Sequence, residues 1–196
     1  VFSLVTMLPD EQLLAWGWRI PFLLSIVLVG VGMFIRLRIP ESPAFQELKG
    51  SGQQARLPLL EALQTHRREI LLAMGARIAE NAFFYIFSVF VLVYVTQQLG
   101  LPRSTALNGI LLASGVALFA IPVFGTLSDR VGRRPVYMAG AAFSGAFTFP
   151  FFWLLDTQQT GLIWLAIVLG IGVGHAAMYG PQASFFSELF QPRMRY

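Results

Sequence analysis

Three ionisable residues lie in stretches of sequence that are otherwise apolar. Arg77 and Glu80 occur in the run ARIAENAFFYIFS, and His175 occurs in GIGVGHAAMYGPQ. Buried glutamate and histidine side chains can exchange protons, whereas arginine stays charged and holds a carboxylate through two parallel hydrogen bonds. These residue types therefore favour proton transfer beside the binding of an anion. The chain contains no cysteine, which excludes thiol and disulfide chemistry.

Helical periodicity gathers further polar side chains around these three residues. At about 100° per residue, Asn81, Phe84, Tyr85 and Ser88 share an arc with Arg77 and Glu80, and Ile78, Phe83, Ile86 and Val89 are expected on the opposite side. Tyr179 and Gln182 follow His175 at i+4 and i+7, on its face. The candidate substrate- and proton-binding residues are Arg77, Glu80, Asn81, Tyr85, His175, Tyr179 and Gln182.

Two alternatives assign these residues no function in binding. Arg77 and Glu80 stand at i,i+3, so they can form a purely structural salt bridge. His175 can be a helix-packing residue with no part in binding. Against both, a charged side chain inside a membrane usually faces a cavity or a partner.

The composition indicates why such residues are expected inside a membrane. Of the 196 residues, 56% are hydrophobic and 12% are charged, about half the charged share of a soluble domain. Five apolar stretches are long enough to cross a bilayer, at about 19–38, 70–95, 104–127, 136–155 and 161–183. They are continuously apolar and do not alternate, which favours helices over a barrel. We therefore expect an all-α, polytopic transmembrane helix bundle, with residues 1–8 as the end of a further helix.

The basic residues predict the orientation of this bundle. Eleven of the 14 lysine and arginine residues fall in 36–68, in 128–135 or at the C-terminal end, whereas the opposite connections hold only Arg19 and Arg103. The positive-inside rule places 39–68, 128–135 and 185–196 in the cytoplasm. Helical rise then puts Arg77, Glu80 and His175 at about 10, 15 and 13 Å from that side. Membrane helices flank the arginines closely, so a nucleic-acid partner is not expected.

The loop 39–68 is the one long polar segment of the sequence. Its stretch LLEALQTHRRE is compatible with an amphipathic helix on the membrane surface. A solvated linker helix fits the same residues equally well.

The turn between the third and fourth apolar stretches carries a specific pattern, Gly125-Thr-Leu-Ser-Asp129-Arg130-Val-Gly132-Arg133-Arg134. This G-x-L-S-D-R-x-G-R-R sequence resembles the signature loop of the major facilitator superfamily, found between helices 2 and 3 and, in degenerate form, between helices 8 and 9. The segments WGWRIPFLLS, IRLRIPESPAF, RIAENAFFY and HAAMYGPQASFFSELFQPRMRY extend the likeness. Together they resemble the metabolite:proton symporter family, whose members carry shikimate, 2-oxoglutarate, citrate, proline and betaine in bacteria.

The resemblance implies a place for each segment in a fold of twelve helices. It implies that 1–38 ends the first half with part of helix 5 and helix 6, that 39–68 is the central cytoplasmic loop, and that 69–196 holds helices 7 to 10. Helices 1 to 4, 11 and 12 of the same protein are then expected as partners outside this sequence. The resemblance also implies a cytoplasmic gating set: Gly125, Asp129, Arg130, Gly132, Arg133, Arg134, Glu188, Arg193 and Arg195.

The function implied is secondary active transport in the bacterial inner membrane. We expect proton-coupled symport of a small organic acid or zwitterion by alternating access, with H⁺ as the coupling ion and no cofactor or metal. A drug/proton antiporter is the nearest alternative, but the buried Arg77 disfavours it. An intramembrane enzyme is not expected, because the sequence has no H-E-x-x-H, G-x-S-x-G or P-loop motif. A non-transporting sensor would need an additional soluble domain.

Overall fold

The computed structural model describes residues 9–38 and 66–189, and among these every regular element is a helix. The chain divides into two compact units, Val1–Gln54 and Ala55–Tyr196, which are described separately. Five helical spans are long and apolar enough to cross a membrane: Leu13–Arg38, Arg67–Gln98, Arg103–Val131, Arg133–Asp156 and Thr160–Glu188. The predicted all-α transmembrane fold is confirmed. The expectations for residues 1–8, and for the loop 39–68 up to residue 65, lie outside the described residues.

The first unit contains one long apolar helix. A short turn of helix, α2 (Asp10–Gln12), leads through the π-helical segment η1 (Leu13–Gly17) into α3 (Arg19–Arg38). The 20 residues of α3 span about 30 Å, the thickness of a bilayer core. Its charged residues are confined to its two ends, where the Arg19 guanidinium lies over the Trp18 ring at 4.4 Å. Such an arrangement suits a helix whose ends lie at the two membrane surfaces.

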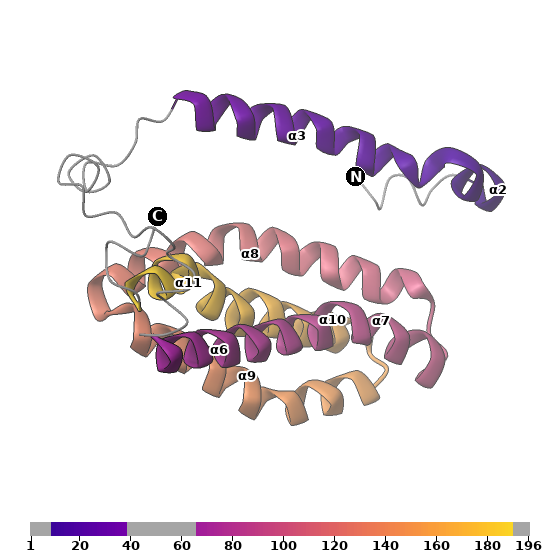
Figure 1. Ribbon diagram of the computed structural model, residues 1–196. Coiled ribbons are helices and arrows are strands. Elements are labelled where there is room, and N and C mark those ends of the chain that lie inside the picture. The colour runs from indigo at the N-terminus through magenta and orange to yellow at the C-terminus, as the bar shows by residue number, and fades with distance from the viewer. Residues whose placement is uncertain (1–8, 39–65, 190–196) are drawn as a thin grey trace. The chain divides into compact units, whose positions relative to one another are not determined.

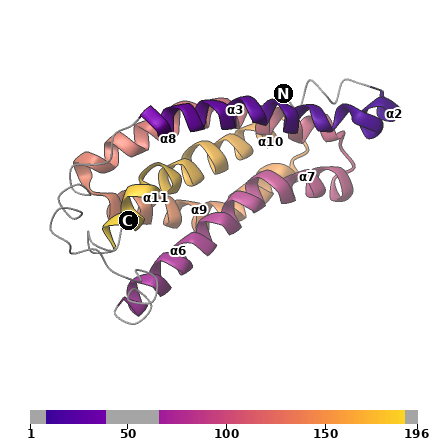
Figure 2. The ribbon, with the colours of Figure 1, turned by 45° about the horizontal axis from the view of Figure 1, so that its top comes forward.

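The second unit contains the other four spans (Figure 1). In the first of them, α6 (Arg67–Tyr85) continues through η2 (Ile86–Phe90), α7 (Val91–Val93) and η3 (Tyr94–Gln98), as one continuous helix in Figure 2. The next two are α8 (Arg103–Val131) and α9 (Arg133–Asp156). The last consists of α10 (Thr160–Val168), η4 (Leu169–His175) and α11 (Ala176–Glu188). The η segments are π-helical, with one extra residue per turn.

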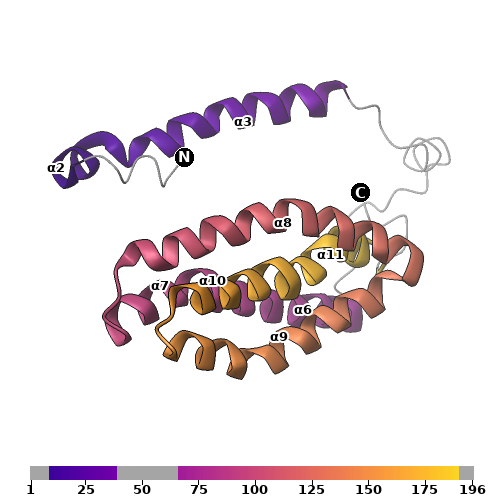
Figure 3. The ribbon, with the colours of Figure 1, turned by 180° about the vertical axis from the view of Figure 1, so that it is seen from behind.

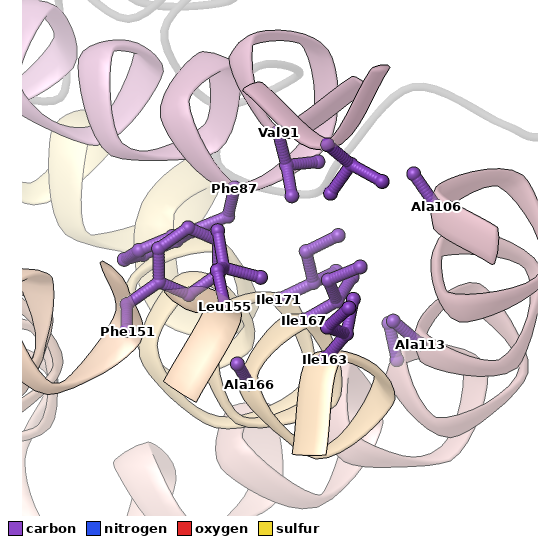
Figure 4. Packing of buried hydrophobic residues seen from close by; sticks show 12 residues of the cluster. Phe87, Val91, Ala106, Ala113, Phe151, Leu155, Ile163, Ala166, Ile167 and Ile171 are labelled. Atoms are coloured by element: carbon purple, nitrogen blue, oxygen red, sulfur yellow. The ribbon is translucent and has the colours of Figure 1, made fainter. Parts of the chain in front are cut away.

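The last span is the centre of this unit. In its most apolar stretch 61% of the residues are buried, against 22%, 11% and 22% for the spans of α6, α8 and α9. Figure 3 shows α10 and α11 running between α8 and α9. Figure 4 shows the core that results, in which Phe87 and Phe151 meet at a centroid distance of 4.9 Å beside Ile163, Ile167 and Ile171. Side chains that this span presents toward α6 are therefore positioned by a well-packed helix.

Two glycines allow the tight geometry at the arginine-rich end. Gly180 of α11 lies so close to α8 that an added Cβ would sit 2.7 Å from the Ile121 carbonyl oxygen and 2.9 Å from the Gly125 nitrogen. Gly132 connects α8 to α9 with φ of 105°, a conformation that other residues rarely adopt. The expectation of a loop over 128–135 is wrong in extent, because only Gly132 lies outside the two helices. Likewise α11 continues past the predicted end at 183 to Glu188.

Candidate functional site

Arg77, Glu80 and Gln182 form a closed polar network between α6 and α11. Arg77 Nη1 donates to Glu80 Oε2 at 2.7 Å and to Gln182 Oε1 at 2.5 Å. Gln182 Nε2 in turn donates to Glu80 Oε2 at 3.1 Å. Residues 102 and 105 positions apart in sequence thus meet in one cluster. The amide of Gln182 joins a cation and an anion because it carries both a donor and an acceptor.

His175 stands on the other side of Glu80. Its Nδ1 lies 3.1 Å from Glu80 Oε1, but the two groups are not aligned for a hydrogen bond, and Nδ1 has no hydrogen-bond partner among the described residues. The imidazole ring packs against Phe84, at a centroid distance of 4.6 Å, and against Tyr179, at 5.2 Å. The two aromatic rings hold the histidine next to the carboxylate without binding its nitrogen.

The network is buried on one side and open on the other. The Glu80 side chain is 1% exposed, whereas that of Arg77 is 47% exposed. Arg77 lines a cavity of about 610 Å³ together with Ala73, Met74, Ile78, Tyr179, Gln182, Ala183 and Phe186. A buried acid therefore lies behind a cation that faces open space. The volume of this cavity lies in the range of small-molecule binding sites. Like such sites, it has mostly apolar walls and a few polar groups.

The structure separates the predicted site residues into two groups. Arg77, Glu80, His175, Tyr179 and Gln182 come together as described. Asn81 and Tyr85 lie on the same helix but form no hydrogen bond or ion pair with the network among the described residues; Tyr85 packs edge-on against Phe84. The predicted arc is wide, so one edge faces the bundle and the other faces away from it.

Ile78 was expected on the face opposite Arg77, and that expectation is wrong. It lines the same cavity as Arg77, because at 100° per residue it lies only about a quarter turn from Arg77 and not on the opposite side of the helix. Tyr137, on α9, was missed altogether. Its hydroxyl donates to the Ala76 carbonyl at 2.7 Å and so ties α9 to α6 one residue before Arg77. A tyrosine in the run RRPVYMAG gives no sequence signal for that contact.

A second ion cluster joins three helix ends at the arginine-rich end of the unit. Arg133, at the start of α9, binds Asp129 of α8 through Nη2 at 3.3 Å and Glu188 of α11 through Nη1 at 2.6 Å. Gly125 provides the close contact with Gly180, and Gly132 the turn. Arg130 and Arg134 are exposed. Arg193 and Arg195, also expected in this cluster, lie outside the described residues.

The chemistry available in the buried network is proton exchange and anion binding. The Glu80 carboxylate is hydrogen-bonded to the Arg77 guanidinium and lies close to the His175 imidazole. No group of three or more residues able to hold a metal ion occurs among residues 9–38 and 66–189.

Comparison with known proteins places the chain in a family. Residues 12–195 match the Major Facilitator Superfamily. The chain is 38% identical over 197 residues to the shikimate transporter of Escherichia coli K12, an alignment that covers 99% of this chain and 45% of that protein. It is 32% identical over 195 residues to an inner membrane metabolite transport protein of the same organism, covering 97% and 44%. It is 29% identical over 208 residues to the proline/betaine transporter of Salmonella typhimurium, covering 100% and 41%. No solved structure matches the chain.

These matches agree with the five membrane-spanning helices and with the predicted resemblance. The chain spans less than half the length of these relatives. The named relatives are transporters and not enzymes, and together with the helices they identify a multi-pass protein of the inner membrane. Because the match extends over nearly all of the sequence, this chain belongs to the Major Facilitator Superfamily.

Proposed function

We propose that the full-length protein is a secondary active transporter that moves a small organic acid or zwitterion together with protons. The observation that carries the proposal is the position of Arg77, half exposed in the 610 Å³ cavity and bonded from behind to the buried Glu80. The names of the relatives support the substrate class, since they include shikimate, proline and betaine transporters.

The free part of the Arg77 guanidinium is suited to a carboxylate. A guanidinium has five N–H donors, of which Nη1 carries two. Both contacts of Arg77 within the network use Nη1. The N–H groups of Nη2 and Nε therefore stay available, and these form a planar fork that binds a carboxylate through two hydrogen bonds. The substrate can then bind without breaking the contact to Glu80.

Charge balance links that binding event to a proton. With Glu80 ionised, Arg77 and Glu80 neutralise each other, and an added substrate carboxylate leaves one net negative charge at membrane depth. Such a charge costs several kcal/mol on most scales, so substrate binding favours uptake of one proton. Glu80 Oε1 and His175 Nδ1, 3.1 Å apart, are the atoms that can share it. In this mechanism the substrate anion and the proton cross together.

The same cavity also suits a zwitterion. Tyr179 and Phe186 line it beside Arg77, and an aromatic face attracts a quaternary or protonated ammonium group. A betaine-like substrate can place its carboxylate on Arg77 and its ammonium on these rings. Drug/proton antiport remains the alternative; a cationic drug would have to bind beside the positive charge of Arg77, which disfavours it.

Uptake into energised membrane vesicles tests the proposal. Vesicles containing the full-length protein should accumulate at least one of labelled shikimate, another small carboxylate, proline or betaine when the outside is made acidic, and accumulation should stop when the pH gradient is dissipated. Gradient-driven export of cationic drugs without uptake of any of these compounds would contradict symport. Arg103→Lys, a change of an exposed arginine outside the cavity, is a matched control for Arg77→Lys.

A further inference from the structure

A second groove in the same unit is lined by residues that have no role in the proposed transport mechanism. It has a volume of about 390 Å³ and lies between α6, α9 and the end of α11. It shares no lining residue with the 610 Å³ cavity. Its walls combine two arginines with apolar and aromatic side chains; the lining residues are Arg68, Leu72, Ala76, Arg134, Tyr137, Met138, Phe185 and Leu189.

The two arginines are the charged part of the groove. Arg68 is the second residue of α6 and Arg134 the second residue of α9, and both are exposed. Neither has an ion-pair partner among the described residues, whereas the neighbouring Arg133 is bound to both Asp129 and Glu188. The partial positive charges of the two helix N-termini add to those of the side chains. The mouth of the groove is therefore strongly cationic.

Below this mouth the groove is apolar. Along α6, Leu72 and Ala76 lie four and eight residues beyond Arg68, which is about 6 and 12 Å deeper at 1.5 Å per residue. Along α9, Met138 lies one turn beyond Arg134. The Tyr137 ring contributes to the wall, and it packs on Phe185 at a centroid distance of 5.2 Å. Its hydroxyl is already used by the Ala76 carbonyl, so the tyrosine has no donor left for a polar ligand.

We propose that this groove binds an anionic phospholipid, with the phosphate between Arg68 and Arg134 and an acyl chain against the apolar walls. The order of the lining residues matches the molecule: the cations stand at the membrane surface and the apolar side chains lie one and two turns deeper. Cationic pockets between transmembrane helices are suited to acidic headgroups. A free phosphate ion would satisfy the arginines but leave the apolar walls uncovered. The bound lipid holds the starts of α6 and α9 together beside the end of α11.

The test measures lipid binding to the purified full-length protein in a neutral detergent. Phosphatidylglycerol, phosphatidylcholine and glycerol 3-phosphate are titrated separately, with retained lipid counted by native mass spectrometry and the unfolding temperature followed in parallel. Phosphatidylglycerol is expected to bind and to raise the unfolding temperature. The zwitterionic lipid and the headgroup without acyl chains should have at least tenfold weaker effects.

The double variant Arg68→Gln/Arg134→Gln should lose at least tenfold in phosphatidylglycerol affinity. The matched control Arg36→Gln/Arg103→Gln removes two exposed arginines that do not line the groove and should bind like the unchanged protein. Ala76→Phe fills the groove while keeping both charges and should also weaken binding of the lipid. Equal affinity in the two double variants would overturn the proposal. So would equal binding of glycerol 3-phosphate, or the absence of retained lipid on the unchanged protein, which would mean that another segment covers the groove.

Discussion

The second unit holds two clusters built around one arginine, which pairs with one acidic side chain in the inner cluster and with two in the outer cluster. In the inner cluster, Arg77 binds Glu80, whose side chain is 1% exposed. In the outer cluster, Arg133 binds Asp129 and Glu188, whose side chains are 63% and 50% exposed. The inner cluster is completed by an amide and faces an imidazole. Among the described residues, the outer cluster is made of charged groups alone.

This difference indicates different uses for similar groups. Water screens the outer pairs, so each contributes about 0–1 kcal/mol and can open and close at little cost. The inner acid cannot exchange its partner for water, so a change in its charge must be compensated by a proton or by another ion. The outer cluster therefore suits a latch between helix ends, and the inner one suits coupling between two bound ions.

The helices that carry the two clusters differ as well. The inner cluster lies on the spans that contain π-helical segments, and η4 ends at His175 itself. In contrast, Asp129 and Arg133 of the outer cluster lie on α8 and α9, which are continuous α-helices, and only its Glu188 lies on α11, at the far end of the span that contains η4. A π-helical turn leaves backbone groups less regularly paired and frequently occurs at functional sites. The site residues thus lie on the two spans with the less regular backbone.

The largest effect is expected from Glu80→Gln. The amide keeps the size of the side chain but cannot carry the proton, so accumulation driven by a pH gradient should fall to background. Exchange of labelled for unlabelled substrate needs no net proton movement and should persist. Both are measured as uptake into vesicles that contain the full-length protein.

Glu188→Gln is the matched control for that change, because it removes a carboxylate from the outer cluster. It should alter the rate of uptake but preserve the dependence of accumulation on the pH gradient. If both variants lost accumulation equally, the functional distinction between the clusters would be wrong. If Glu80→Gln accumulated substrate normally, His175 would become the candidate proton carrier.

Arg77→Lys should have the next largest effect. Lysine keeps the charge but loses the planar fork, and the loss of one charge-assisted hydrogen bond corresponds to about tenfold in affinity for a carboxylate substrate. Equilibrium binding of labelled substrate measures this change. The same substitution at Arg103 should leave substrate affinity unchanged. Unaltered binding in Arg77→Ala would leave the salt bridge with Glu80 as the main role of the arginine.

The inner cluster was predictable because its residues are charged or polar in helices that are otherwise apolar. Arg77, Glu80 and His175 are conspicuous in apolar helices, and simple helical rise placed them at similar depth. Spacing along one helix also put Gln182 on the face of His175. What it could not supply was the rotation of α6 relative to α11, which decides that Glu80 points inward while Asn81 and Tyr85 stay outside the network.

Other features were out of reach because they depend on long-range packing. Nothing in the sequence predicts that the Tyr137 hydroxyl meets the Ala76 carbonyl, since the partner is a backbone atom 61 residues away. The limits of the helices near Gly132 were missed for a different reason. Charged residues such as Arg130 and Arg133 end an apolar stretch but do not end a helix. The ranges predicted from hydropathy were therefore shorter than α8 and α9. The assignment of the spans to helices 6 to 10 of the family, and of the arginine-rich side to the cytoplasm, stays a prediction.

Asp129→Asn should slow transport by a few fold and hardly change substrate affinity. Removal of the carboxylate weakens an exposed ion pair between α8 and α9 that contributes about 0–1 kcal/mol. The balance between conformations therefore shifts by a few fold at most, while the substrate contacts on Arg77 stay in place. Transport rate and equilibrium binding are measured on the same preparation, with Asp129→Glu as the variant that keeps the charge. A large loss of affinity at an unchanged conformational balance would exclude the latch.

The smallest effect is expected when an ion pair of the outer cluster is removed and the stability of the protein is measured. Glu188→Gln removes one exposed ion pair, so the free energy of unfolding should fall by less than about 1 kcal/mol. The loss should shrink further in high salt, since added ions screen an exposed pair. Denaturation followed by tryptophan fluorescence, at low and high salt, measures both quantities. Glu80→Ala is the counterpart in the inner cluster and leaves Arg77 without its acid. Its effect should be larger and less sensitive to salt, because the Glu80 carboxylate is buried, with 1% of its side chain exposed. A salt-sensitive loss at Glu80 of the same size as that at Glu188 would show that burial does not separate the two clusters energetically.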